Sequence, residues 1–412
     1  MGEAAAKKNN RSAFMSDFEK IDHSLLQTTL ISAIYPVGPA AIILMPMIVG
    51  GLVDSYGFSD QQAGAIATAE GLGLVSGLLV AVLWVRKLPW RMSLLVGLMS
   101  YAAVNFGSSV AQGHMQILVL RFLSGFIGGG VFAVVVAALG DNREPDRAFG
   151  IAQAVQGLLM GALFAIAPLL MTTSGVNGVF YMMAGLAVMT MLFLPRFPQY
   201  GVIDTATPDH SGGSPKSNVT MVWLYLGLLG GFVYYLAVFG FWGFIERMGM
   251  QAGLDPGTVG LALGVSQIAA IVGALAAAGA AQRFGRFVPL LVALIGQLWV
   301  LWLLVGKFST LAFYAGACAY QGLYVMATSY QLGVIASLDA KGKFIVIMTA
   351  LQGLGAALGP SIAAGLVLDG DYSAINWAAA GALALSLGIF LVLTQRYRSR
   401  TESTEVEYDD AG

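Results

Sequence analysis

The sequence predicts an all-α integral membrane protein in which twelve transmembrane helices form two pseudo-symmetric six-helix bundles. Three observations predict this class. The chain contains twelve apolar segments, each close to the roughly 20 residues that an α-helix needs to cross a bilayer core. Lys and Arg residues concentrate in every second connection between these segments. Charged residues make up 10% of the chain and hydrophobic residues 57%, whereas soluble domains contain about 25% charged residues.

The apolar segments place the helices at residues 28–53, 61–84, 92–111, 115–139, 148–171, 176–195, 219–245, 257–281, 287–305, 309–337, 344–368 and 375–394. Prolines at positions 36, 39 and 46 predict that the first helix is bent or locally broken. Ser59 and Gln62 have the spacing of a capping box at the start of the second helix.

The basic residues predict the orientation of the chain, because short loops rich in Lys and Arg stay on the cytoplasmic side. Two alternate connections hold Arg247 and Lys307, and Arg121 lies inside a predicted helix. All other basic residues fall in the remaining connections and tails, at Lys7, Lys8, Arg11, Lys20, Arg86, Lys87, Arg91, Arg143, Arg147, Arg196, Lys216, Arg283, Arg286, Lys341, Lys343, Arg396, Arg398 and Arg400. We therefore expect a multi-pass protein of the cell membrane, inner or plasma, with both termini in the cytoplasm.

The polar segments divide the chain into five parts. Residues 1–24 are expected to be a cytoplasmic tail without a removable signal peptide, because no short apolar region with a cleavage site occurs there. Residues 25–196 form the first bundle, 197–218 a flexible cytoplasmic linker rich in proline and glycine, and 219–396 the second bundle. Residues 397–412 are an acidic cytoplasmic tail that we expect to be disordered.

Two loops indicate that the halves arose by duplication. Residues 147–157 read RAFGIAQAVQG, and residues 343–353, at an offset of 196, read KFIVIMTALQG. The basic segments 86–90 and 282–286 align at the same offset. Parallel six-helix repeats are typical of transporters whose site lies between the halves near the middle of the membrane.

Glycines four residues apart allow close helix packing. They recur in every third predicted helix, which leaves the helices at 92–111, 176–195, 287–305 and 375–394 outermost; with 53 glycines, some pairs also arise by chance. The residues assigned to helix packing are Gly73, Gly77, Gly125, Gly157, Gly161, Gly260, Gly264, Gly355, Gly359 and Pro360.

On these features the chain resembles the major facilitator superfamily of secondary transporters. The family's loop motif, G-x-x-x-D-R-x-G-R-R, is partly kept in two copies, and the resemblance implies a gating role for it. The positions are Arg86, Lys87 and Arg91 in the first copy, where Arg86 replaces the acid, and Arg283, Gly285 and Arg286 in the second, where Gln282 does.

Two further motifs support the resemblance. The family's fourth helix carries an arginine four residues before a glycine, as Arg121 and Gly125 do here. The G-x-x-x-G-P motif, which exporters carry in the fifth helix, occurs here in the eleventh, from Gly355 to Pro360. The resemblance implies a major facilitator fold whose first, fourth, seventh and tenth helices line a central cavity.

Two charged residues lie inside the predicted helices, Glu70 and Arg121, and the predicted helices of the second half contain none. An ionisable residue at membrane depth is a candidate for function. From the ends of their helices, Glu70 lies roughly 13 Å deep and Arg121 roughly 9 Å, so the two can meet. We interpret them as a proton-coupling pair, in which burial and the arginine act in opposite directions on the acid. The alternative is a static ion pair that joins two helices.

Aromatic residues dominate the predicted cavity helices and suggest a wall for an aromatic or apolar substrate. Packing or lipid-facing positions are the alternative for any one of them. Gln153, Gln156 and Gln352 are expected to form hydrogen bonds between helices or with substrate. The predicted substrate-binding residues are Tyr35, Arg121, Tyr234, Tyr235, Trp242, Tyr320, Tyr324 and Gln331.

These observations predict a proton-coupled secondary transporter that moves a small organic molecule by alternating access. The cargo is an aromatic or apolar compound, or an organic anion neutralised by Arg121, and the missing exporter motif favours uptake by symport. A proton-antiport exporter of drugs or metabolites is the alternative, followed by a polytopic membrane enzyme or a lipid-handling protein.

Enzymatic and cofactor signatures are not found in the sequence. We expect no enzymatic activity, because the nucleotide-binding G-x-x-x-x-G-K-[ST] loop is missing and no cluster of catalytic groups appears. No cofactor or metal is expected, since His23, His114 and His210 lie in separate tails or loops, and Cys318 is the single cysteine. The expected partners are the substrate, protons and the lipid bilayer, without nucleic acid, for a chain that functions as a monomer.

Overall fold

The predicted all-α fold class is confirmed by a computed structural model that describes residues 25–111, 113–142, 144–201, 221–284, 287–338 and 343–409. No β-strand occurs among these residues. The elements of the first half are α2 (Leu25–Ser32), η1 (Tyr35–Val37), α3 (Ala40–Ile43), α4 (Met45–Tyr56), α5 (Asp60–Ala81), α6 (Trp90–Val110), α7 (His114–Gly140), α8 (Pro145–Ser174), α9 (Asn177–Thr190) and η2 (Met191–Arg196). Those of the second half are α10 (Met221–Gln251), α11 (Pro256–Phe284), α12 (Phe287–Leu303), α13 (Thr310–Leu338), α14 (Lys343–Ala364) and α15 (Ser373–Asp409).

The first predicted span is broken, as its prolines indicate. It comprises α2, η1, α3 and α4, with Pro36 inside η1, Pro39 immediately before α3, and Pro46 in the first turn of α4. Proline removes a backbone donor and blocks the preceding turn, so a helix interrupted three times is the expected result. Among the described residues, nine helices are long and apolar enough to cross a membrane, and Leu25–Val37 and Phe287–Leu303 are shorter apolar helices.

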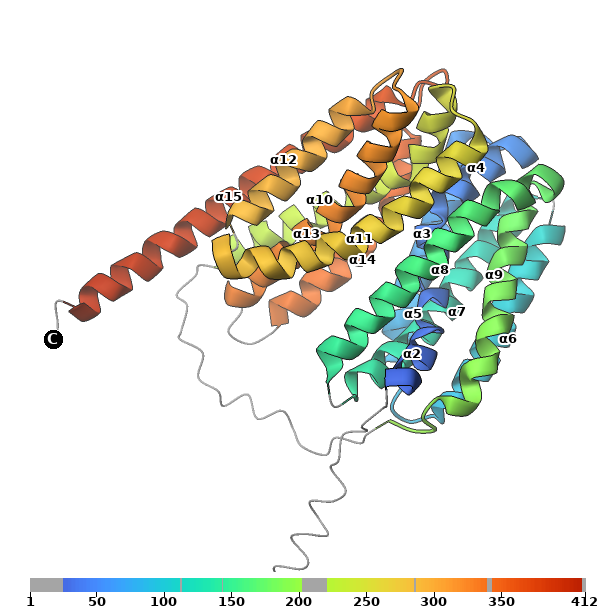
Figure 1. Ribbon diagram of the computed structural model, residues 1–412, viewed down its shortest axis with the longest axis horizontal. Coiled ribbons are helices and arrows are strands. Elements are labelled where there is room, and N and C mark those ends of the chain that lie inside the picture. Colours follow the sequence, from blue (N-terminus) through green and yellow to red (C-terminus); the bar gives the residue numbers. More distant parts are fainter. Residues whose placement is uncertain are drawn as a thin grey trace, which may run out of the picture.

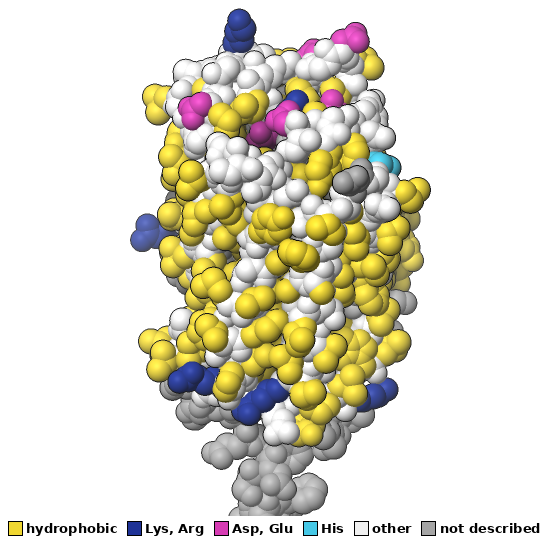
Figure 2. Space-filling model, turned by 90° about the vertical axis from the view of Figure 1, so that its right-hand side faces the viewer, with side chains coloured by type: hydrophobic (Ala, Val, Ile, Leu, Met, Phe, Trp, Pro, Cys, Tyr) yellow, Lys and Arg dark blue, Asp and Glu magenta, His cyan; other side chains and the backbone are white. Residues whose placement is uncertain are grey.

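The helices form two bundles, one of α2 to η2 and one of α10 to α15, which meet at one end and spread apart toward the other (Figure 1). We call the end that carries Leu25, Arg196 and Met221 the tail side, and the end that carries Tyr56 and Ser373 the far side. In Figure 2, hydrophobic side chains cover the middle of the molecule, acidic side chains gather near the far side, and most visible Lys and Arg side chains lie near the tail side.

Three helix pairs join the bundles: α8 with α11, α5 with α14, and α4 with α10. At the first crossing, a Cβ on Gly161 would lie 3.0 Å from the Gly264 carbonyl, and a Cβ on Gly264 would lie 2.8 Å from the Gly161 carbonyl. At the second crossing, a Cβ on Gly71 would lie 2.7 Å from the Cα of Ala357. The bundles therefore touch backbone to backbone at these points, as small residues permit.

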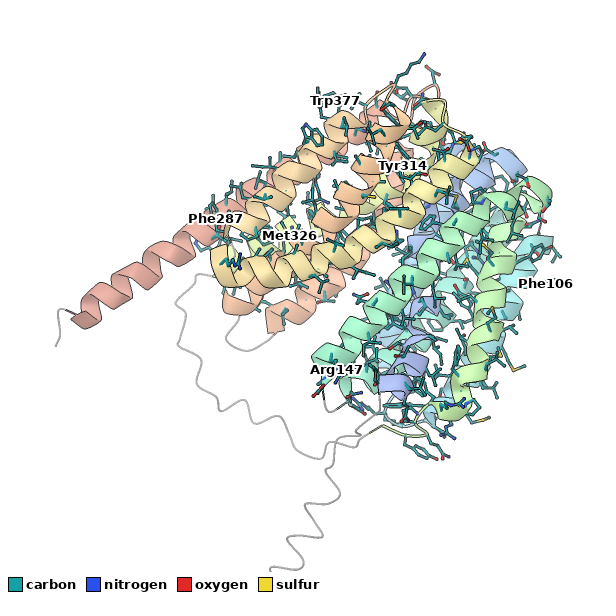
Figure 3. All side chains as sticks on the ribbon, viewed as in Figure 1. Phe106, Arg147, Phe287, Tyr314, Met326 and Trp377 are labelled. Carbon is teal, nitrogen blue, oxygen red and sulfur yellow. The ribbon has the colours of Figure 1, made fainter. Side chains whose placement is uncertain are left out.

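The same device joins helices within each bundle. A Cβ on Gly73 or Gly125 would collide with the backbone of the facing helix in the α5–α7 pair. A Cβ on Gly355 or Gly359 of α14 would lie 2.6 Å from a backbone carbonyl of α10. The helices predicted to lie outermost, α6, α9, α12 and α15, take no part in the three interfaces between bundles. Figure 3 shows Phe106 of α6 and Trp377 of α15 pointing outward, where both are more than half exposed.

Several helices run beyond their predicted ends, and α10 and α15 do so furthest. The seventh predicted helix, α10, continues to Gln251, because its termination comes at Gly253, whose φ is +89°, and Leu254 N–H donates to the Gly249 carbonyl. The prediction that the second half has no charge inside its helices is therefore wrong, since Glu246 and Arg247 lie within α10.

The last helix, α15, continues to Asp409 and projects beyond the bundle (Figure 1). The expectation of disorder in residues 397–412 stays a prediction, and the last three of these residues lie outside the described part. No glycine or proline follows Gly388 before Asp409, so nothing in this stretch stops the helix.

Candidate functional site

A cavity of about 500 Å³ lies between the two bundles. Its walls come from both halves, from α3 and α8 on one side and from α10, α11 and α13 on the other. No charged side chain lines it among the residues that the structure describes. Its aromatic and polar lining consists of Gln153, Gln156, Tyr235, Phe239, Trp242, Gln267, Tyr320, Gln321, Tyr324, Thr328 and Ser329.

The Trp242 indole lines the cavity at a contact between the two bundles. The Trp242 Nε1–H on α10 donates to the carbonyl of Ile43 on α3 at 3.0 Å, so one hydrogen bond crosses between the bundles. The ring of Phe164 on α8 meets the same indole edge to face, at 6.1 Å between ring centroids. The break in the first span makes this contact possible, because Ile43 is the last residue of α3.

Aromatic rings from α10 and α13 form one wall. The Tyr235 ring lies 5.9 Å from Tyr324 and 5.7 Å from Phe239, and Phe239 and Tyr324 are 5.8 Å apart. The Tyr235 hydroxyl donates to Thr328 Oγ1 at 3.3 Å, and the Tyr320 hydroxyl donates to the Val238 carbonyl at 3.3 Å. The wall is therefore apolar over the ring faces and anchored at the hydroxyls.

Amide side chains form the polar part of the lining. The Gln156 Nε2 donates to Gln153 Oε1 at 3.4 Å, whereas Gln156 Oε1 is buried without a hydrogen-bond partner. On α11, Gln267 is 6% exposed and its Nε2 is also without a partner. Unpaired buried amides that border a cavity can orient a ligand, because burial without a partner is costly.

Four of the eight predicted substrate residues line this cavity, namely Tyr235, Trp242, Tyr320 and Tyr324. The other four do not. Tyr35 packs against Phe132 at 4.9 Å between ring centroids, and the Tyr234 hydroxyl donates to Gln297 Oε1 on α12 at 2.9 Å. Gln331 lies two turns beyond Tyr324 and is fully buried outside the lining.

The remaining predicted residue, Arg121, lies inside the first bundle with Glu70. The Arg121 Nη1 is 3.2 Å from Glu70 Oε1, and the two side chains are 0% and 4% exposed. The Arg121 Nη2 donates to Asn105 Oδ1 at 2.9 Å and to Ser108 Oγ at 2.8 Å. Its guanidinium also lies 4.6 Å from the centroid of the Phe180 ring. These partners enclose the pair between α5, α6, α7 and α9.

A polar cluster closes the far side between the bundles. The Arg247 Nη1 of α10 is 2.5 Å from Asp54 Oδ1 of α4, and its Nε donates to the Tyr372 hydroxyl at 3.2 Å. That hydroxyl donates to Asp60 Oδ1 at the start of α5, at 2.9 Å. Burial, opposed by Arg247, raises the pKa of Tyr372 above the usual value of 10.0. We call Asp54, Asp60, Arg247 and Tyr372 the far-side cluster.

Beside the cluster lies Glu246, which was outside the predicted helix ends and was missed. It is 5% exposed, and its Oε2 is buried without a hydrogen-bond partner. Extending the helix in the sequence to the glycine at position 253 would have placed this acid inside the membrane segment.

The loop-motif residues lie on the tail side. Arg86 pairs with Asp141 at 2.6 Å at the end of α7, and its guanidinium lies 5.7 Å from the Trp90 ring centroid. Arg91 Nε donates to the Phe197 carbonyl at 2.5 Å. These contacts stay within the first bundle. Lys87 and Arg283 are exposed, and Gly285 and Arg286 lie outside the described residues.

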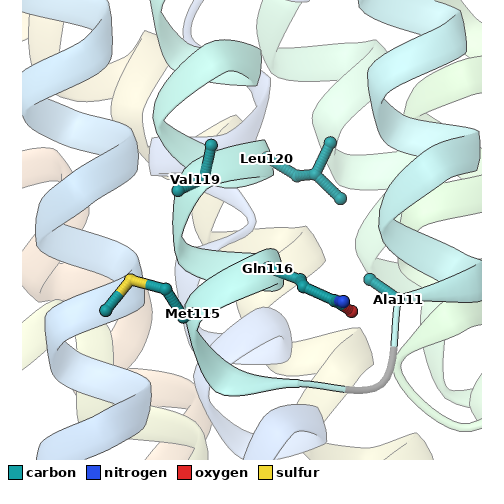
Figure 4. A pocket seen from close by; sticks show the side chains of 5 residues that line it. All are labelled: Ala111, Met115, Gln116, Val119 and Leu120. Atoms are coloured by element: carbon teal, nitrogen blue, oxygen red, sulfur yellow. The ribbon is translucent and has the colours of Figure 1, made fainter.

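A shallow depression on the outer surface is lined by Ala111, Met115, Gln116, Val119 and Leu120 (Figure 4). It follows the first turns of α7 and is lined by apolar side chains apart from Gln116, so it carries little that could recognise a polar solute. In the described part of the chain, no group of three or more His, Cys, Asp or Glu side chains could hold a metal ion.

Comparisons with known proteins agree with this architecture. The nucleoside transporter NupG has a TM-score of 0.70 at 12% identity, over 90% of this chain and 98% of that chain. A structure from the proton-dependent oligopeptide transporters has a TM-score of 0.67 at 12% identity, over 93% and 100%. A bacterial homologue of the human lysosomal transporter Spinster, inward-facing and occupied, has a TM-score of 0.64 at 13% identity, over 90% and 96%.

No curated protein matches the chain. At such identities the solved structures show a shared fold alone. The Major Facilitator Superfamily profile matches residues 36–319 and 227–408, and this match confirms the resemblance noted in the sequence. The chain therefore belongs to the major facilitator superfamily and is a multi-pass membrane transporter.

Proposed function

We propose that this transporter carries a small, uncharged organic molecule with an aromatic or apolar face, by alternating access of the cavity between its bundles. The observation that carries the proposal is the lining: aromatic rings and amides converge on the cavity, and no charge does among the described residues. A cavity of about 500 Å³ is within the usual range for small-molecule sites.

The alternative of an organic anion depended on Arg121. That side chain is fully buried among Glu70, Asn105, Ser108 and Phe180 and is not part of the cavity wall. An anion entering the cavity would leave its water shell without meeting a cation, which is unfavourable in a low-dielectric site. The geometry therefore favours a neutral cargo.

Paired ligands of equal shape test this proposal. Benzamide against benzoate, and nicotinamide against nicotinate, differ chiefly in charge. We expect at least one neutral member to raise the melting temperature of the purified protein, because a ligand that binds the native state stabilises it. Its anionic partner should not. Stabilisation by the anions alone would contradict the proposal.

Variants show whether such binding occurs in the cavity. Tyr324→Ala should weaken binding at least about tenfold, since an aromatic contact contributes about 1.4 kcal/mol or more. The matched control is Tyr225→Ala, because Tyr225 is 60% exposed on the outer surface of α10. Equal losses in both variants would place the binding elsewhere.

Orientation and proton coupling complete the proposal. The concentration of Lys and Arg near the tail side supports a cytoplasmic position for that side, which makes the described conformation inward-facing. The sequence assigned the coupling proton to Glu70, and this assignment stays a prediction. It requires that Glu70→Gln keeps substrate exchange in liposomes but loses accumulation driven by a pH gradient.

A further inference from the structure

The Glu246 carboxyl lies at a contact between the two bundles. Its α10 helix packs on α4 of the first bundle, and its carboxyl atoms fill the space into which a Cβ at Gly50 would project. The carboxyl therefore rests directly on the backbone of the opposite bundle. Separation of α4 from α10 would open this contact to the far side.

Among the described residues, none donates a hydrogen bond to the buried Oε2 of this group. Glu246 is 5% exposed, and its Oε2 has no hydrogen-bond partner. Arg247, next to it on α10, directs Nη1 to Asp54 and Nε to the Tyr372 hydroxyl. A carboxylate buried in this way is several kcal/mol less favourable than in water, and the neutral acid avoids that cost.

The titratable groups on the surrounding elements do not reverse the preference of Glu246 for its neutral form. Arg247 favours the ionised form of Glu246, and Asp54 on α4 opposes it. Asp60, at the start of α5, accepts a hydrogen bond from Tyr372, which precedes α15. Asp371 lies beside Tyr372, is exposed and accepts hydrogen bonds from Ser373. The far-side cluster thus pairs its arginine with Asp54 and its tyrosine with Asp60.

We propose that the Glu246 carboxyl is a proton-binding site whose occupancy is linked to closure of the far side. In the closed arrangement the group carries its proton. When α4 and α10 separate, water reaches the carboxyl, and the proton passes to water on the far side. By linkage, whatever favours the protonated form favours closure, and a rise in pH favours opening. This inference rests on the alternating access in the proposed function.

Distances between the bundles on the far side test the site. Cysteines replace Gln61 at the start of α5 and Lys307 between α12 and α13, two exposed residues of opposite bundles, in a Cys318→Ala background. Spin labels at these positions report the separation by electron–electron double resonance in lipid nanodiscs. The measurement runs between roughly pH 4 and pH 9, a range in which carboxyl groups in proteins titrate.

We expect the long-distance population to grow with pH in the otherwise unchanged chain. Glu246→Gln is permanently uncharged, so it should stay at the short distance throughout and lose the pH response. Glu246→Asp should retain a response, because it can still release a proton. A full pH response in Glu246→Gln would overturn the proposal. So would a pH-independent distance distribution in the parent chain.

Two further acids separate the possible sources of a response. Glu144→Gln, at an exposed side chain, is the matched control and should leave it unchanged. Glu70→Gln tests the alternative proton-binding site. If the distance between the bundles loses its pH dependence in Glu70→Gln and keeps it in Glu246→Gln, the proton binds in the first bundle and the proposal is overturned. A single distance under every pH and every ligand would instead count against alternating access itself.

Gly50→Ala gives an independent reading if Glu246→Gln does not fold. The added methyl group would take the space of the carboxyl, so the closed contact should become less favourable. We expect a shift toward the long distance at every pH. An unchanged distribution would show that the carboxyl does not control this contact, and would overturn the proposal.

Discussion

The buried acid inside the first bundle and the buried acid between the bundles have opposite surroundings. Glu70 faces a guanidinium at 3.2 Å, and that guanidinium is held further by Asn105 and Ser108. Glu246 has a carboxylate oxygen without any hydrogen-bond partner and rests on the bare backbone of Gly50. The first group lies among helices of one bundle, whereas the second lies where two bundles meet.

This difference separates two uses of a buried charge. A paired acid within one bundle keeps its partner if that bundle moves as a rigid unit, so we expect its ionisation to depend less on how the bundles move. An unpaired acid at a contact between bundles meets water in one arrangement and not in the other. Burial alone therefore does not identify a coupling residue; its partners and its position relative to the moving parts do.

The largest expected effect comes from breaking the paired site. Arg121→Ala leaves the Glu70 carboxylate buried without its cation, and such losses cost about 3–5 kcal/mol of stability. The melting temperature and yield in detergent measure this effect. Arg147→Ala, which removes an exposed pair with Glu144, should change little. A variant of Arg121 that folds normally and shifts only the pH dependence of transport would favour a coupling role for the pair.

A smaller effect is expected in the far-side cluster. Tyr372→Phe removes a hydroxyl that bonds to both Arg247 and Asp60, a loss of about 0.5–1.5 kcal/mol. Because burial raises the pKa of Tyr372, this contribution is fully present below the usual value of 10.0 and is lost as the pH rises through the raised pKa.

Melting curves of Tyr372→Phe and the parent chain should therefore differ at neutral pH and converge in alkali. Tyr225→Phe, at a hydroxyl-bearing ring that is 60% exposed, serves as the control. A difference that persists unchanged in strong alkali would mean that the hydroxyl proton does not matter to the cluster.

The smallest effect on stability is expected at Glu246. Glu246→Gln replaces an unpaired neutral acid with an amide of the same shape, so the free energy of unfolding should change by less than about 0.5 kcal/mol at neutral pH. Glu70→Gln, which loses a charged hydrogen bond, should cost about 1.5–3 kcal/mol. Differential scanning fluorimetry compares the two. Equal losses would show that Glu246 is ionised and paired, and the contrast between the acids would disappear.

Sequence patterns predict much of the fold because they reflect local rules. The prolines at 36, 39 and 46 predict the broken first span, since each removes a backbone donor. Glycine pairs such as Gly161 and Gly264 mark places where only small residues fit. In both cases the signal lies in the residue that makes the contact.

The site is harder to read, because it depends on which way a side chain points in the assembled bundle. Tyr234 and Tyr235 are neighbours in sequence, yet one meets Gln297 inside its own bundle and the other lines the cavity. Adjacent residues on a helix point about 100° apart, so both could not face the same space. Depth along the helix axis was enough to place Glu70 near Arg121, but it does not show that the pair is closed off from the cavity.

The glycine crossings also have a mechanical consequence. At Gly161 and Gly264, and at Gly71 and Ala357, the two bundles are in contact through main-chain atoms rather than through interdigitated side chains. Contacts between main-chain atoms allow the two bundles to rotate against each other by a small angle, because few side chains have to change rotamer. The far-side cluster lies on one side of these crossings and the separated tail-side ends of the bundles lie on the other, so we expect a rotation that opens the first to bring the second together.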